Sequence, residues 1–165
     1  MDASSMKASL LGVMMLSGSL VFAQHHGDSS MHSGHVMVNS ANVKWMAGPP
    51  FLPAGVKMAV LEGDPSKEGP FTVRLMMPAN YTIPPHTHPT IEHVTVIDGD
   101  FFMGAGKSLD RAGAMKLNRG GYAVMPANFA HYAFSQGRAQ VQVHGMGPFA
   151  INYINPADDP RSKKK

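Results

Sequence analysis

The chain has 165 residues, of which 44% are apolar, and a formal net charge of +3. This length and apolar content predict one folded domain with one core. Cysteine is absent, which excludes disulfides, thiolate metal sites and cysteine nucleophiles, so any bound metal must have nitrogen and oxygen ligands. Four of the basic residues lie at positions 161 and 163–165. The rest of the chain is nearly balanced in charge, and a nucleic-acid partner is therefore not expected.

The first 23 residues predict an export signal. Lys7 supplies a weak positive charge, residues 8–22 are apolar, and small residues lie near Ala23, where a signal peptidase would cut. The apolar run is too short to span a membrane comfortably. We therefore expect residues 1–23 to be removed, and the mature protein to be periplasmic or secreted without membrane attachment.

Residues 24–40 predict a flexible, histidine-rich arm. Residues 24–35 contain four histidines and almost nothing apolar to bury. If cleavage follows Ala23, the terminal amine, two backbone nitrogens and the ring of His26 form a square-planar set that suits copper(II) or nickel(II). A metal-capturing arm and a solvated linker without a metal role both remain open.

Residues 41–155 show the pattern of an antiparallel β-sandwich or barrel, with short apolar runs separated by turn residues. Asp98-Gly99-Asp100 predicts a hairpin turn. The best helix candidate, residues 110–117, is interrupted by Gly113. Residues 156–165 predict a solvated basic tail. The expected strands are 57–61, 71–76, 92–97, 101–103, 122–125, 131–135, 139–144 and 149–154.

The segment from position 84 to 92 carries the strongest indication of chemistry. Side chains alternate between the two faces of a strand, so His86 and His88 project to the same side and can share one metal ion. Glu92 has the same parity and can add a carboxylate oxygen. His131, at the start of a later predicted strand, is the best candidate for a fourth ligand.

Two motifs make this sequence resemble the cupin family. His86-x-His88-x3-Glu92-x6-Gly99 is similar to the second part of the first cupin motif, and Gly120-x5-Pro126-x4-His131 to most of the second. The resemblance covers residues 58–154 and is to small bacterial single-domain cupins. It implies an all-β double-stranded β-helix, or jelly-roll barrel, with one metal inside its mouth. The ligands that the resemblance implies are His86, His88, Glu92 and His131.

The sequence departs from the cupin motifs at three positions. Asn80 and Asn128 stand where the motifs carry glycine, and Ser135 stands where the second motif closes on asparagine. Asparagine tolerates positive φ better than most residues, so the same turns are expected. His93 has the opposite parity to Glu92 and is expected to face away from the metal, although a shift of one residue in register would exchange the two.

Three histidines and one glutamate leave positions on an octahedral ion for water, oxygen or a substrate. We expect one divalent transition metal, with copper, iron, manganese and zinc all compatible with these ligands. Glu92 and Tyr132 are the predicted catalytic residues, with Glu92 acting as a ligand or as a base. Arg74 would anchor a substrate carboxylate if it pointed inward.

The first functional hypothesis is a metal-dependent oxidoreductase of the dioxygenase or oxidase type, acting on a small organic or carbohydrate-derived substrate. A metal-dependent isomerase or lyase is the alternative enzyme class. A non-catalytic metal- or ligand-binding cupin is the third, as in the zinc-bound cupin half of certain anti-sigma factors, which the sequence also resembles. Because cupins commonly pair through their sheets, the resemblance further implies a homodimer.

Overall fold

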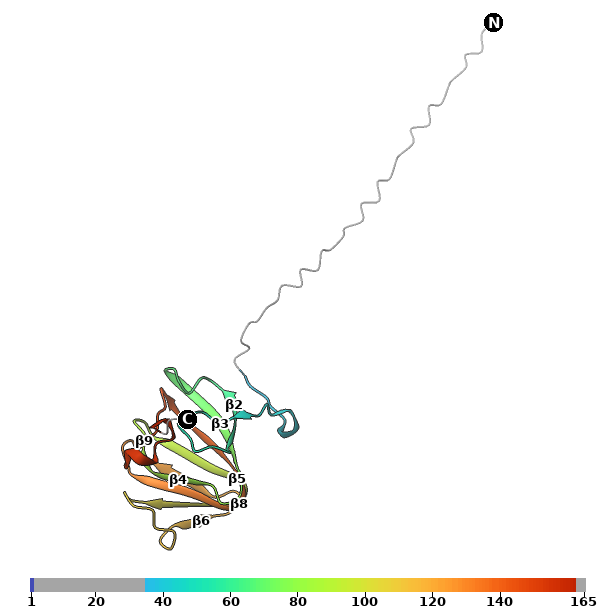
Figure 1. Cartoon of the computed structure of the whole chain (residues 1–165). Coiled ribbons are helices and arrows are strands. Elements are labelled where there is room, and N and C mark those ends of the chain that lie inside the picture. The colour runs from blue at the N-terminus through green and yellow to red at the C-terminus, as the bar shows by residue number, and fades with distance from the viewer. Residues whose placement is uncertain (2–34, 163–165) are drawn as a thin grey trace. The chain divides into compact units, whose positions relative to one another are not determined.

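The computed structural model describes Met1 and residues 35–162 (Figure 1). The predicted export signal, most of the histidine-rich arm and the last three lysines lie outside the described residues. Within this part of the chain there is no α-helix, and no helix is long and apolar enough to cross a bilayer. The strands are β1 (Met46–Ala47), β2 (Lys57–Glu62), β3 (Gly69–Met77), β4 (Thr82–Thr87), β5 (Glu92–Ala105), β6 (Met115–Leu117), β7 (Tyr122–Met125), β8 (His131–Gly147) and β9 (Asn152–Tyr153). Three short 3-10 helices are η1 (Ser40–Asn42), η2 (Pro156–Asp158) and η3 (Pro160–Ser162).

Two long strands, β5 and β8, organise the fold. Residues 131–135 of β8 pair with β4 and with the second half of β5. Residues 139–147 of β8 pair instead with β3 and with the first half of β5. Each half is extended by further antiparallel strands, with β2 and β1 beyond β3, β9 beyond β4, and β7 and β6 along β5. The all-β jelly-roll prediction is confirmed.

The prediction of a hairpin turn at Asp98-Gly99-Asp100 is wrong. β5 continues through these residues without a turn. Its register against β8 shifts between Val96 and Asp98 and again between Gly99 and Phe101. Gly99 has a φ of 75°, and a Cβ atom there would lie 2.1 Å from the carbonyl oxygen of Arg138. The glycine therefore permits a bulge that carries one strand from one sheet to the other.

β4 is not among the expected strands, and it contains Pro84 and Pro85, which lack the amide hydrogens that a sheet uses. The structure accommodates them in an irregularity. β4 pairs with β8 at Thr82 and Ile83 and then again at His86, with a register shift between the two stretches. The best helix candidate, which Gly113 interrupts, forms no helix, and its residues 115–117 form β6.

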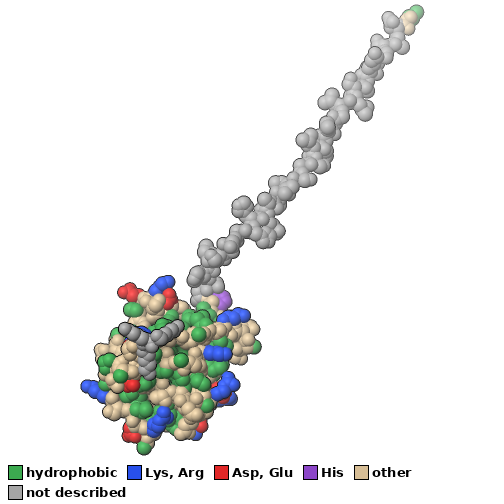
Figure 2. All heavy atoms as spheres, viewed as in Figure 1, with side chains coloured by type: hydrophobic (Ala, Val, Ile, Leu, Met, Phe, Trp, Pro, Cys, Tyr) green, Lys and Arg blue, Asp and Glu red, His purple; other side chains and the backbone are tan. Residues whose placement is uncertain are grey.

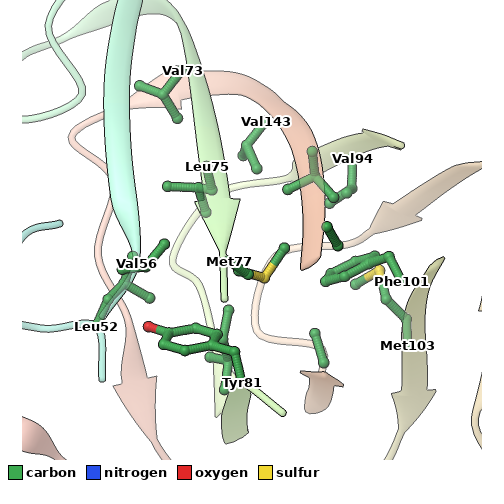
Figure 3. Close-up of a cluster of buried hydrophobic side chains, with 14 of the residues drawn as sticks. Leu52, Val56, Val73, Leu75, Met77, Tyr81, Val94, Phe101, Met103 and Val143 are labelled. Atoms are coloured by element: carbon green, nitrogen blue, oxygen red, sulfur yellow. The ribbon is translucent and has the colours of Figure 1, made fainter. Parts of the chain in front are cut away.

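The core lies between the sheets and follows the two-residue period of the strands. On β3, Phe71, Val73, Leu75 and Met77 are buried, while the residues between them are only partly covered. Figure 3 shows Val73, Leu75 and Val143 pointing into one interior space, with Leu52 beside it. Burying each such side chain contributes about 1.5–3 kcal/mol. The packed strands form a rigid frame for the polar cluster described below.

The described part of the predicted tail contains two short helices, and none of its residues is buried. Residues 156–158 and 160–162 form η2 and η3, and the Asn155 side chain accepts a hydrogen bond from the first of these helices. Arg161 donates a hydrogen bond to the carbonyl oxygen of Ile151 at 3.1 Å and forms an ion pair with Asp159. The bond to Ile151 ties the segment to the residues just before β9.

Charged side chains on the surface are balanced locally. On the face shown in Figure 2, basic and acidic side chains are scattered singly or in small groups. Exposed ion pairs join Lys67 to Asp64, Lys116 to Asp100 and Arg119 to Asp98. Such pairs contribute little to stability.

Candidate metal centre

The ends of three strands bring the four predicted ligands together. His86 lies near the end of β4, directly opposite His131, the first residue of β8. Glu92 begins β5, and His88 lies in the connection between β4 and β5. Asn128, at a φ of 62°, donates its backbone N–H to the carbonyl oxygen of His88 at 2.7 Å. All four ligand candidates are buried.

Each histidine ring is held by a backbone carbonyl. The Nδ1 atoms of His86, His88 and His131 lie 2.7, 2.8 and 2.9 Å from the carbonyl oxygens of Pro84, Ala150 and Phe129, respectively. Because a carbonyl only accepts hydrogen bonds, each Nδ1 carries the proton, and each Nε2 keeps a free lone pair. One ring nitrogen from each of the three residues lies within 4.8 Å of the others. Three buried imidazoles are thus positioned to bind one metal ion.

The donor atoms of this cluster fit a cation. Glu92 Oε2 lies 3.3 Å from His131 Nε2 and 3.6 Å from His88 Nε2, and none of these three buried atoms has a hydrogen-bond partner among the described residues. Lone pairs therefore face one another with no donor between them. A buried polar atom without a partner costs about 1–3 kcal/mol. A divalent ion coordinated by these atoms would remove that cost.

The protonation states also suit metal binding. Burial, together with the neighbouring rings of His131 and His88, lowers the pKa of His86 from 6.5 to about 3, so its ring is neutral at physiological pH. A bound cation would favour the ionised form of the Glu92 carboxylate. A neutral imidazole and an ionised carboxylate are the forms that coordinate a metal.

The lowered pKa of His86 predicts that the metal-free protein loses stability on acidification. Between pH 6.5 and about 3, His86 is protonated in the unfolded chain but not in the folded chain. The free energy of unfolding therefore falls as the pH falls. His86 alone should account for about 2 kcal/mol between pH 6.5 and 4.5. Urea unfolding in the presence of a chelator measures this slope, and an unchanged slope in His86→Gln would contradict the assignment.

An apolar cavity of about 170 Å³ borders the cluster, and His86, His88 and Glu92 form part of its wall. A second space of about 20 Å³, roughly the size of one water molecule, touches His86, Glu92 and His131. A molecule in the larger cavity would therefore lie next to the ligand atoms. The other residues of its wall are Pro49, Phe51, Leu52, Met58, Pro65, Ser66, Phe71, Val73, Leu75, Ile83, Val143, Phe149 and Ile151.

The structure does not bring Tyr132 together with the other predicted site residues. Its side chain lies on the opposite face of β8 from that of His131, with its ring over Gly104 on β5. Its hydroxyl donates a hydrogen bond to the carbonyl oxygen of Asp110. The residue is buried but does not line either cavity next to the cluster. This position gives Tyr132 a packing role.

Arg74 and His93 both face the outside of the sheet. Arg74 donates to Gln142 Oε1 at 3.1 Å, so the condition under which it would anchor a carboxylate, an inward-pointing side chain, is not met. His93 contacts the Tyr122 hydroxyl through Nδ1 at 2.6 Å, and its ring stacks on that of His144. It faces away from the cluster, as its parity predicts.

Residues 148–151 contribute to the site in a way that the sequence did not reveal. Phe149 stacks on the ring of His88, with 4.3 Å between ring centroids, and the Ala150 carbonyl orients the same ring. No pattern in the sequence marks either contact. By contrast, His86 and His131 each use the carbonyl two residues before them, a local spacing that sequence reasoning could have tested.

A double-sheet β-barrel with three buried histidines converging near a cavity defines a cupin-type protein with a site for one metal ion. The sequence matches the family described as the ChrR cupin-like domain over residues 33–150, which is most of the chain. The chain belongs to this family, and its small single-domain cupin fold is the one that the motifs predicted.

Solved structures show the same fold at low sequence identity. An acetylacetone dioxygenase from Acinetobacter johnsonii is 16% identical, with a TM-score of 0.56 over 96% of this chain and 88% of that chain. The polyketide cyclase RemF from Streptomyces resistomycificus is 14% identical, with a TM-score of 0.58 over 75% and 88%. An RmlC-like cupin from Shewanella frigidimarina is 12% identical, with a TM-score of 0.53 over 67% and 88%. Comparison with curated proteins found no match. Likeness at this level establishes the fold alone.

Proposed function

We propose that the protein is a metal-dependent oxidoreductase of the dioxygenase or oxidase type that acts on a small organic molecule. The observation that carries this proposal is a cluster of three buried histidines and one glutamate, of which His86, His88 and Glu92 lie in the wall of an apolar cavity. The name of the Acinetobacter johnsonii protein, which shares the fold, supports dioxygenase chemistry. A site of this kind offers both a place for an ion and a dry chamber for an organic substrate.

Some residues of the site would bind the ion, and others orient the ligands or form the apolar wall around them. His86, His88, His131 and Glu92 would hold a divalent iron, copper or manganese ion, which when bound supplies electron exchange between an organic molecule and dioxygen. The carbonyls of Pro84, Ala150 and Phe129 fix the ring orientations. The apolar wall excludes water from the reacting groups. Glu92 is the one carboxylate among the described residues of this wall, and it brings negative charge and a proton acceptor to the chamber.

We further propose that the protein is exported and forms a homodimer. The apolar segment before Ala23 supports export. Exposed apolar side chains at the outer face of the sheet formed by β5, β7 and β8 support pairing between copies. They are Ile91, Tyr122, Val124 and Met146.

Metal content combined with oxygen uptake tests the proposed redox function. The protein, purified after native export, is expected to contain about one equivalent of iron, copper or manganese, and to consume oxygen when supplied with a suitable small organic molecule. Protein reloaded with zinc, which has no redox chemistry, is the matched control and should consume none. Tightly held zinc in the native protein, with no oxygen uptake in any reloaded form, would contradict the proposal.

A further inference from the structure

We infer that the cavity beside the metal cluster binds small uncharged molecules that have an apolar body and one oxygen atom able to coordinate the metal. We further infer that it rejects sugars and polyols. The inference rests on the proposed function and narrows its substrate class. It uses three properties of the cavity, which are the chemistry of its wall, its size, and the position of its few polar atoms.

The wall offers almost no partners to a polar ligand. Among the described residues that line the cavity, Glu92 is the one charged side chain, and Ser66 carries the one hydroxyl. The nearest arginine on β3, Arg74, is engaged with Gln142 on the outer face. Each sugar hydroxyl placed against such a wall would lose its hydrogen bonds to water, at about 1–3 kcal/mol per group. A polyol would therefore be excluded by the sum of these costs.

The volume of the cavity, which is partly open to solvent, limits the part of a ligand that can be buried beside the cluster. At about 170 Å³, it is close to an engineered apolar cavity of about 150 Å³ in another protein, which binds benzene. The segment that supplies Leu52 to the wall is tied down on both sides of this residue. Tyr153 donates to the carbonyl oxygen of Phe51 at 2.8 Å, and Tyr81 donates to that of Pro53. The size is thus built into the folded chain, and a single six-membered ring with one substituent fills it.

The polar atoms of the wall lie together at the metal cluster. His86, His88 and Glu92 contact the cavity, while Phe149 stacks on the His88 ring and packs 5.1 Å from the ring centroid of Phe71. The backbone N–H of Phe149 donates to the carbonyl oxygen of Pro65 at 2.7 Å, which fixes its position. One oxygen of a ligand can therefore meet the metal, while the rest of the ligand meets aromatic and aliphatic side chains. Phe149 sets the width of the chamber next to the ligand histidines.

Binding of three probe molecules to the zinc-loaded and metal-free protein tests the inference by calorimetry and NMR. Phenol, with an apolar ring and one oxygen, is expected to bind both forms, and at least about tenfold more tightly when zinc is present. Benzene should bind both forms equally, and myo-inositol should show no saturable binding. Binding of myo-inositol as tight as that of phenol, or failure of both phenol and benzene to bind, would overturn the inference.

Two variants that change the cavity in opposite directions sharpen the test. Leu52→Trp should fill the chamber and abolish phenol binding while zinc is retained, and Phe149→Ala should admit 2-naphthol, which the wild type excludes. Thr95→Ala, on the outer face of β5, is the control and should bind phenol normally.

Phenol binding unchanged in both cavity variants would overturn the inference. Phenol binding as expected, with no oxygen uptake from any substrate, would contradict only the proposed oxidoreductase function; turnover of a sugar would contradict only the substrate class.

Discussion

Replacement of His131 by alanine is expected to weaken metal binding by more than about 100-fold, because the loss of an outer hydrogen-bond partner of a ligand alone costs 10- to 100-fold. His131 is almost fully buried, lies opposite His86 across the β4–β8 pair, and is within 3.3 Å of Glu92. Among the described residues, only His86 and His88 share with it a group that could hold a metal ion. Elemental analysis and competition with a chromogenic chelator measure the loss.

His93→Ala is the matched control for this prediction. His93 is adjacent to Glu92 in sequence, but its ring stacks on His144 on the other face of the sheet. Its removal should leave metal content and affinity unchanged. Metal retained at full affinity by His131→Ala, or lost equally from both variants, would show that the ion binds elsewhere.

The second large effect is expected at the bulge of β5, where Gly99→Ala should lower the free energy of unfolding by about 3 kcal/mol or more. The residue has a φ of 75°, which L side chains disfavour, and an added Cβ would lie 2.1 Å from the carbonyl oxygen of Arg138 and 3.0 Å from the Cα of Ala139. Both atoms belong to the backbone of β8, so no change of side-chain rotamer can relieve the clash. Denaturant unfolding at neutral pH measures the change.

Gly120→Ala separates the backbone strain at Gly99 from the steric clash. Gly120 has a similar φ of 81°, but a Cβ atom there would meet nothing within 4 Å. We expect this variant to lose only about 1 kcal/mol, from the strained φ alone. Equal losses in the two variants would mean that the close approach of β5 and β8 is not what requires glycine at position 99.

The part of the ligand cluster formed by His86, His88 and Glu92 was predictable from local rules, whereas His131, on a distant strand, was placed by the spacing of the second motif. Alternation along an extended segment fixes the common side of His86 and His88, and the turn that follows brings Glu92 back to the same side. The two asparagines that replace motif glycines also behave as expected, with φ values of 60° at Asn80 and 62° at Asn128. Each of these features is decided by a few neighbouring residues.

The features that sequence reasoning missed depend on contacts between distant segments. Phe149 reaches His88 across about sixty positions, and nothing local marks that contact. Tyr132 was predicted to be catalytic but lies on the face of β8 opposite His131, and both faces of this part of β8 are buried. The loop carrying Asp110 and Arg111 covers the outer face there, with the Arg111 guanidinium 4.4 Å from the ring centroid of Phe134.

Crystallographic anomalous scattering, recorded at the absorption edge of the metal found by elemental analysis, tests the metal centre most directly. The predicted result is one strong peak among the Nε2 atoms of His86, His88 and His131, beside Glu92 Oε2, and its disappearance in crystals of His131→Ala. A peak at the outer pair of His93 and His144 instead, or a central peak that persists without His131, would contradict the assignment of this cluster as the metal site.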